Sequence, residues 1–182
     1  MGIEDYERSA ALSAKAIGDA GNAKSRSYWS PYIAYTNQGL ALYRLGNLAE
    51  AEQAFERARE VQPNLSPAHY HLGLVALSKG DLAAAQEHFE RALELRPNDP
   101  FVAGNLAFVK LHRGDARGCV DLLEPLVAQE TVSLTDRRNY GSALLLLQEF
   151  PAAVEQFRLI VAAEPERAID RAKMAWALNG MR

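Results

Sequence analysis

Apolar residues recur at intervals of three and four along most of the chain, which is the spacing of one face of an α-helix. The segments 34–45 and 48–61 show this spacing first, and similar pairs of segments follow them. A glycine followed by Asn or Asp separates the members of three pairs, at Gly46-Asn47, Gly80-Asp81 and Gly114-Asp115. Glycine ends a helix in the left-handed conformation, and Asn or Asp caps the next one. The pattern therefore predicts pairs of short helices joined by tight turns.

These pairs repeat with a period of 34 residues. The residues that agree best between the first two copies are 34 positions apart. They are the pairs Gly39 and Gly73, Ala51 and Ala85, Phe55 and Phe89, Ala58 and Ala92, and Pro63 and Pro97. Two later copies are looser and place Ala107, Cys119 and Leu123, then Gly141, Ala153, Phe157 and Pro165 at these positions. Thr131 stands where proline is expected and Gln148 where glycine is expected. We predict four copies, at 32–65, 66–99, 100–133 and 134–167.

The small residues at 39, 73, 107 and 141 predict that the two helices of each copy approach closely at that point. Residues 1–31 are predicted to form an N-terminal helix over 3–19 and a polar linker at Gly21–Ser30. Residues 168–182 continue the register of a first helix, with Ala175 at the small position. We expect this last helix to cap the stack, because the end of a repeat array needs a polar outer face.

A helix–turn–helix unit of 34 residues with this spacing of Gly, Gly, Ala, Phe, Ala and Pro resembles the tetratricopeptide repeat (TPR) family. The resemblance is close at 32–65 and 66–99 and looser at 100–133 and 134–167. It implies an all-α fold, a right-handed α-solenoid of TPR repeats with a C-terminal capping helix. It also implies that the first helix of each copy lines a concave face on which such proteins bind peptides.

Composition and charge exclude several classes of function. The chain has 182 residues and a formal net charge of −3, which disfavours nucleic acid as the main partner. No run of 18 apolar residues is present, so direct membrane insertion is not expected. The first residues lack the pattern of a secretory signal. We expect a cytoplasmic protein, or a soluble fragment of a longer cell-envelope protein.

Chemistry-bearing residues form no catalytic or metal-binding pattern. Cys119 occupies the repeat position of Ala51 and Ala85, so we interpret it as a small thiol in a packed interface. His69 and His71 are two residues apart and point to different faces of a helix, whereas a metal pair on a helix needs a separation of four. The carboxylates of the second helices mix with arginines, as on a solvated face. We therefore expect no enzymatic activity, no cofactor and no metal.

The concave positions that the family resemblance implies are the second, fifth, sixth, ninth, twelfth and thirteenth residues of each copy and of the last helix. None of these 30 positions is acidic, although 23 of the 182 residues are Asp or Glu and random placement gives about four acids there. The resulting surface is apolar and aromatic with a slightly positive edge. The predicted peptide-binding residues are Asn37, Leu40, Tyr43, Arg44, Tyr70, His71, Leu74, Phe101, Asn105, Phe108, His112, Arg138 and Asn139.

Asn37, Asn105 and Asn139 share one repeat position, and the family uses asparagines there to hold an extended peptide backbone. An amide suits this role because it carries both donors and an acceptor. The alternative is that these asparagines only face solvent. The family's clamp for the C-terminal carboxylate of chaperones needs Lys at the place of Thr36 and Asn at the place of Leu40, so that specialisation is not expected here.

The function predicted from the sequence is a non-enzymatic scaffold that binds an extended or helical segment of a partner protein. The expected partner segment has acidic and hydrophobic character. Analogy with the family and the Ala-, Leu- and Arg-rich style of the repeats indicate an adaptor or assembly factor in a bacterial secretion, pilus or polysaccharide-export complex. The alternative is a structural module that forms homo-oligomers through its terminal helices.

Overall fold

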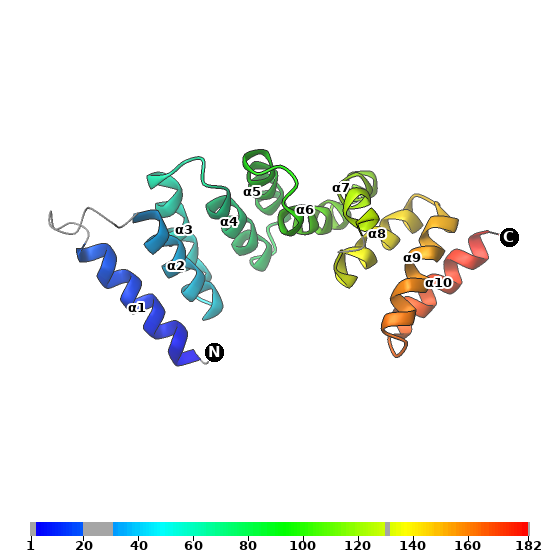
Figure 1. Cartoon of the computed structure of the whole chain (residues 1–182), viewed down its shortest axis with the longest axis horizontal. Coiled ribbons are helices and arrows are strands. Elements are labelled where there is room, and N and C mark those ends of the chain that lie inside the picture. The colour runs from blue at the N-terminus through cyan, green and yellow to red at the C-terminus, as the bar shows by residue number, and fades with distance from the viewer. Residues whose placement is uncertain (1–2, 20–30, 130–131, 182) are drawn as a thin grey trace. The chain divides into compact units, whose positions relative to one another are not determined.

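The computed structural model describes residues 3–19, 31–129 and 132–181, and in these ranges it contains ten α-helices and no strand (Figure 1). The predicted all-α class is confirmed. The expected linker at Gly21–Ser30 and the irregular position Thr131 lie outside the described residues. The helices are α1 (Ile3–Asp19), α2 (Pro31–Arg44), α3 (Leu48–Val61), α4 (Ser66–Ser78), α5 (Leu82–Leu95), α6 (Pro100–His112), α7 (Ala116–Ala128), α8 (Leu134–Leu146), α9 (Phe150–Ala163) and α10 (Ala168–Gly180).

The chain divides into two compact units, residues 1–98 and 99–182. In the first unit, each helix from α1 to α5 packs against the next one along the chain. In the second unit, α6 to α10 pack in the same sequential way, and α8 also contacts both α6 and α10. Alternate helices within the second unit therefore lie side by side, as they do in an α-solenoid.

The turns within the helix pairs have the chemistry that the sequence predicts. Gly46, Gly80 and Gly114 have φ values of 81°, 80° and 86°, which glycine adopts without steric cost. The carboxylates of Asp81 and Asp115 accept hydrogen bonds from backbone N–H groups of the helices that follow them.

Two positions in these turns differ from the simple pattern. Asn47 was predicted to cap α3 but makes no side-chain capping hydrogen bond, and its neutral amide oxygen is a weaker acceptor than the two carboxylates. Gln148 replaces the glycine of the fourth copy and still adopts a left-handed φ of 61°. The turn geometry is thus imposed by the packing of the two helices, even where the residue does not favour it.

The predicted close approach between paired helices is present and has a specific form. A Cβ atom built on Gly39 or Gly73 would lie 2.6 or 2.5 Å from the ring of Phe55 or Phe89. The same atom on Gly141 would lie 3.1 Å from the ring of Phe157. Each ring is fully buried, so the small residue on the first helix makes the space that the aromatic residue of the second helix fills.

The last helix, α10, packs on α9 but differs from the first helices before it. Its residues Asp170 and Ala177 are buried, and its Gly180 lies over the ring of Phe150. Ala175 stands at the small position of the repeat but is exposed. This position marks no tight helix contact in α10, because within the described residues no second helix follows it.

The fold suppresses the ionisation of Cys119, which is fully buried, and of His71, which is half-buried. Burial, together with the charges of Asp115 and Asp136, raises the pKa of the Cys119 thiol to about 12. The thiol is therefore neutral and packed, as the sequence predicts. The His71 ring stacks on Phe55, with ring centroids 4.8 Å apart. Burial, together with the charge of Arg44, lowers the pKa of His71 to about 4.

The first unit is therefore expected to lose stability in mild acid. Because the folded pKa of His71 is below its unfolded value, stability is fully present above pH 6.5 and falls as the pH drops towards 4. The pKa difference corresponds to about 3 kcal/mol at its fullest extent. Urea unfolding between pH 7.5 and 4.5 measures the slope, and His71→Gln should flatten it. An equal slope in both proteins would assign the acid sensitivity to other groups.

Candidate functional site

A cleft of about 650 Å³ lies in the second unit, between α6, α8 and α10. We call it the α6–α8–α10 cleft. Aromatic and aliphatic side chains form much of its wall, and no Asp or Glu of the described residues lines it. Its apolar lining residues are Phe108, Leu111, Leu145, Leu146 and Trp176, and its polar lining residues are His112, Thr135, Arg138, Asn139, Ser142, Arg167 and Lys173.

The repeat period explains how this cleft is built. Phe108, Ser142 and Trp176 occupy the same repeat position on three successive first helices. Asn139 and Lys173 share another position, and Leu111 and Leu145 a third. Because α8 packs against both α6 and α10, the same helix face is presented three times, and its side chains converge on one space.

Lys173 is the cationic group in the cleft that has no carboxylate partner among the described residues. Its Nζ atom donates a hydrogen bond to Ser142 Oγ at 2.8 Å and lies 5.8 Å from the centroid of the Phe157 ring. Burial lowers the pKa of Lys173, and the negative charge of Asp170 opposes that effect. Ser142 Oγ in turn donates to the carbonyl oxygen of Arg138 at 2.7 Å.

Asn139 carries an unsatisfied hydrogen-bond donor. Its Nδ2 atom is buried and has no hydrogen-bond partner in the described structure. A buried amide without a partner costs about 1–3 kcal/mol relative to one that is satisfied. Asn139 and Lys173 both line the cleft, and each carries a hydrogen-bond donor without a carboxylate partner among the described residues.

The guanidinium of Arg138 is held by acidic side chains instead. Its Nε atom donates to Asp170 Oδ2 at 2.9 Å, and its Nη2 atom donates to Glu164 Oε2. The Asp170 carboxylate also lies 3.5 Å from Arg167 Nε. These contacts offset the positive charge of Arg138 and link α8 to α10, and a role of Arg138 in peptide binding stays a prediction.

Four of the thirteen predicted binding residues line the cleft, namely Phe108, His112, Arg138 and Asn139. Two others in this unit do not. Phe101 is 75% exposed, and Asn105 Nδ2 donates to the carbonyl oxygen of Phe101 in its own helix at 2.8 Å. The amides of Asn105 and Asn139 thus have different surroundings, although they share a repeat position.

The other seven predicted residues belong to the first unit. Leu40 and Tyr43 pack against its buried cluster around Phe55, and the Tyr43 hydroxyl lies 2.9 Å from Ser78 Oγ. His71 stacks on Phe55 as described above. Several of these side chains therefore have a packing role, whereas others at the predicted positions are exposed. Asn37 and Arg44 are exposed, and Tyr70 and Leu74 are half-buried.

The concave positions implied by the family resemblance include every residue of the cleft lining except Arg167. Arg167 is the residue that precedes α10, so it lies outside the periodic positions of the first helices. Within the described residues, no group of three or more His, Cys, Asp or Glu side chains has an arrangement that holds a metal ion. None of the described helices has the length and apolar character needed to cross a membrane.

Comparisons with known proteins agree with this architecture. Two family models described as tetratricopeptide repeat match residues 33–100 and 76–133, which together make up more than half of the chain. A comparison with curated protein sequences gives no match. The fold and the repeats define an α-solenoid repeat protein. The chain belongs to the tetratricopeptide repeat family.

Solved structures of TPR proteins share the fold at low sequence identity. The crystal structure titled "YrrB: a TPR protein with an unusual peptide-binding site" has a TM-score of 0.81 and 21% identity, and the match covers 92% of this chain and 82% of that one. MamA AMB-1 has a TM-score of 0.74 and 21% identity, with 82% of each chain covered. MamA MSR-1 has a TM-score of 0.73 and 21% identity, with 82% of this chain and 86% of that chain covered.

Proposed function

We propose that this chain is a non-enzymatic interaction scaffold that captures a segment of a partner protein in the α6–α8–α10 cleft. The observation that carries the proposal is the pair of donors on Lys173 and Asn139, which have no acidic partner among the described residues and belong to a cleft lined by aromatic and aliphatic side chains. A half-buried cation and a buried amide in an apolar cleft favour an acceptor that arrives with its own hydrophobic anchor.

The ligand chemistry follows from these side chains. Among the described residues no carboxylate lines the cleft, so an acidic side chain of the partner can reach Lys173, although the negative charge of Asp170 also acts on it. Phe108 and Trp176 supply aromatic surface for a large apolar side chain. We therefore infer a peptide segment in which an acidic residue is next to, or one helical turn from, a bulky hydrophobic residue.

The fold favours binding because the cleft is already formed. Its residues sit on helices that are held by packed cores, so most of the ordering cost falls on the incoming peptide. YrrB, which shares the fold, is described as a TPR protein with an unusual peptide-binding site. We propose the same class of ligand here, and the role of adaptor or assembly factor in a larger complex.

Selection from a random peptide display library on the immobilised chain tests this function. We expect enriched peptides to share an acidic and a bulky apolar residue. Lys173→Met, which keeps the aliphatic stem, should weaken their binding by about tenfold, because it removes a charge-assisted hydrogen bond. No enrichment, or equal binding to the wild type and to Lys173→Met, would contradict the proposal.

Asn139 and Asn105 provide a matched pair for the amide contribution. Asn139→Ala is expected to weaken the selected peptides by about fivefold to tenfold, since a hydrogen bond contributes about 1 kcal/mol. Asn105→Ala should have little effect, because its amide nitrogen is bonded within α6 and lies outside the cleft lining. Isothermal titration of both variants measures the difference. Equal losses would mean that the shared repeat position, rather than the cleft, determines binding.

A further inference from the structure

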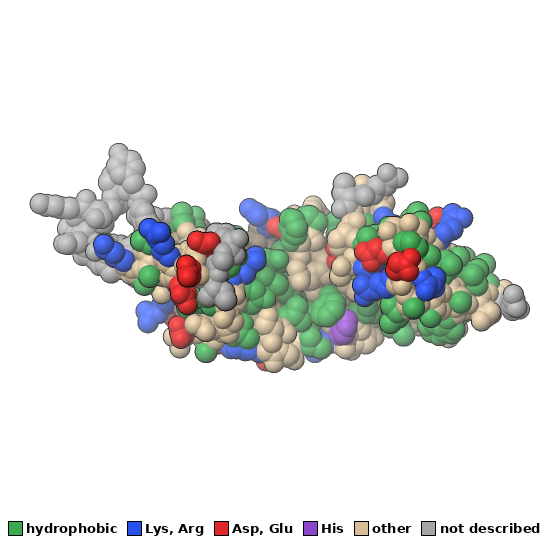
Figure 2. All heavy atoms as spheres, turned by 90° about the horizontal axis from the view of Figure 1, so that it is seen from below, with side chains coloured by type: hydrophobic (Ala, Val, Ile, Leu, Met, Phe, Trp, Pro, Cys, Tyr) green, Lys and Arg blue, Asp and Glu red, His purple; other side chains and the backbone are tan. Residues whose placement is uncertain are grey.

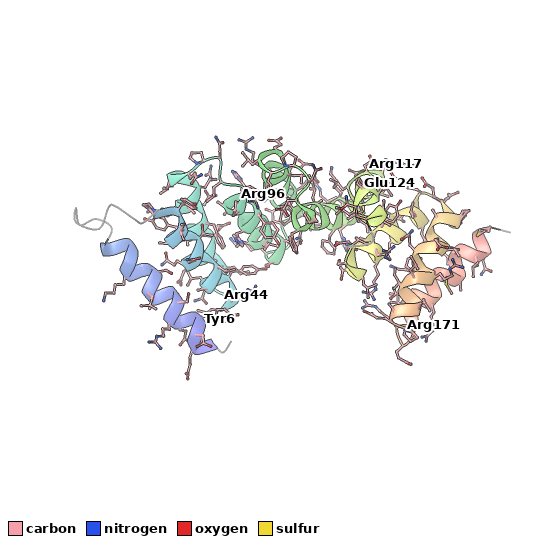
Figure 3. The ribbon with its side chains drawn as sticks, viewed as in Figure 1. Tyr6, Arg44, Arg96, Arg117, Glu124 and Arg171 are labelled. Carbon is pink, nitrogen blue, oxygen red and sulfur yellow. The ribbon has the colours of Figure 1, made fainter. Side chains whose placement is uncertain are left out.

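Beyond its contribution to the cleft, α10 presents a second surface that the proposed function does not use. Ala175 and Leu178 lie on this surface and are exposed, as is Arg171 near the first turn of the helix (Figure 3). We call these three residues the α10 outer face. Figure 2 shows hydrophobic side chains gathered at the end of the molecule where α10 lies.

Earlier copies in the same chain show what covers this face. The residues 34 positions before Ala175 and Leu178 are Gly141 and Leu144, and both are buried. The ring of Phe157, from the second helix of that copy, lies against Gly141. Gly39 and Gly73 meet Phe55 and Phe89 in the same way. The covering element is thus an amphipathic helix with an aromatic side chain placed over the small residue.

A polar contact accompanies the aromatic one in the fourth copy, and a ring contact takes its place in the second. Arg137, which stands 34 residues before Arg171, donates from Nη1 to Oε1 of Gln156 at 2.8 Å, and Gln156 directly precedes Phe157. In the second copy the corresponding pair is His69 and His88, whose rings lie 5.8 Å apart, and His88 directly precedes Phe89. In both copies, the residue directly before the aromatic residue of the second helix therefore contacts the first helix at the position that corresponds to Arg171.

We propose that the α10 outer face binds an amphipathic helix of another protein. The helix has an aromatic residue over Ala175 and a Glu or Gln directly before it, within reach of Arg171. Arg171 donates one hydrogen bond to the carbonyl oxygen of Pro165 and has no carboxylate partner among the described residues. It is the one charged residue of the face, so charge complementarity favours glutamate over glutamine at that position. In the proposed interface, the partner helix packs on α10 as α9 packs on α8.

A fluorescently labelled peptide with the sequence of residues 149–163 is a direct probe, because this segment covers the corresponding face of α8. Fluorescence anisotropy with the full chain should show saturable binding. In the peptide, Phe157→Ala should weaken binding at least tenfold, and Gln156→Glu should strengthen it severalfold. In the protein, Ala175→Arg should abolish binding, whereas Leu12→Arg, at an exposed position of α1, should leave it unchanged.

Both protein substitutions are at exposed positions, and circular dichroism with thermal melting verifies that each variant is folded. Lys173→Met lies in the cleft and should bind the helical probe like the wild type, so this proposal and the proposed function fail separately. Absence of binding, or equal binding by Ala175→Arg, overturns the proposal. Sedimentation velocity adds one outcome: a concentration-dependent dimer of the wild type that Ala175→Arg abolishes shows that a second copy covers the face, and this also overturns it.

Discussion

Replacement of Gly73 by leucine is expected to destabilise the first unit by about 3 kcal/mol, at the upper end of the usual range for overpacking. Even the first carbon of the new side chain would lie 2.5 Å from the ring of Phe89, and that ring is fully buried. Neither the ring nor the helix backbone can yield without opening the contact between α4 and α5. Urea unfolding followed by circular dichroism measures the loss.

Ala175→Leu is the matched control for this substitution. Ala175 stands at the same position of the repeat, but it is exposed and faces no aromatic ring from a following helix within the described residues. We therefore expect a change within about 0.5 kcal/mol, as at ordinary surface positions. Similar losses for Gly73→Leu and Ala175→Leu would mean that the contact with Phe89 does not determine the cost, since helix propensity alone favours leucine over glycine.

The fold could be predicted from the sequence because its determinants are local and repeated. The first two copies mark the left-handed turn with glycine, the close approach with a small residue and the filler with an aromatic ring, as in Gly73 and Phe89. Four imperfect copies support one another, so a single irregular residue such as Gln148 does not obscure the period. The exposure of Ala175 was not predictable in this way, because the pattern reports the register of a helix and not whether a neighbour covers it.

The site was predicted less completely, because side-chain pairing depends on contacts between copies. The family resemblance placed Asn105 and Asn139 at the same position, yet one amide bonds to its own helix and the other is buried without a partner. Arg138 counts as a basic residue in the sequence, but Asp170 and Glu164 neutralise it in the structure. Those acids are 32 and 26 residues away, so no local pattern relates them to Arg138.

Removal of the Asp170 carboxylate is expected to have the second large effect. Asp170 is 1% exposed and Arg138 is 14% exposed, so the pair is shielded from water and loss of one member leaves a buried charge without its partner. Breaking such a pair typically costs about 3–5 kcal/mol, and we expect about 3 kcal/mol for Asp170→Ala, because Glu164 still contacts Arg138. Thermal melting of the second unit should fall on the order of 10 °C. Glu155→Ala, which removes an exposed pair with Arg158, should cost less than about 1 kcal/mol.

The same ion pair links stability to binding, because α10 carries both Asp170 and the cleft residues Lys173 and Trp176. Asp170→Ala should therefore weaken peptides that bind the α6–α8–α10 cleft, even though Asp170 does not line it. The double variant Asp170→Leu with Arg138→Met separates the two effects, since replacing both members of a buried pair by apolar residues is often neutral for stability. If the double variant recovers the melting temperature and also the affinity, the pair acts by positioning α10. Recovery of stability without affinity would instead assign Arg138 a direct role in the cleft.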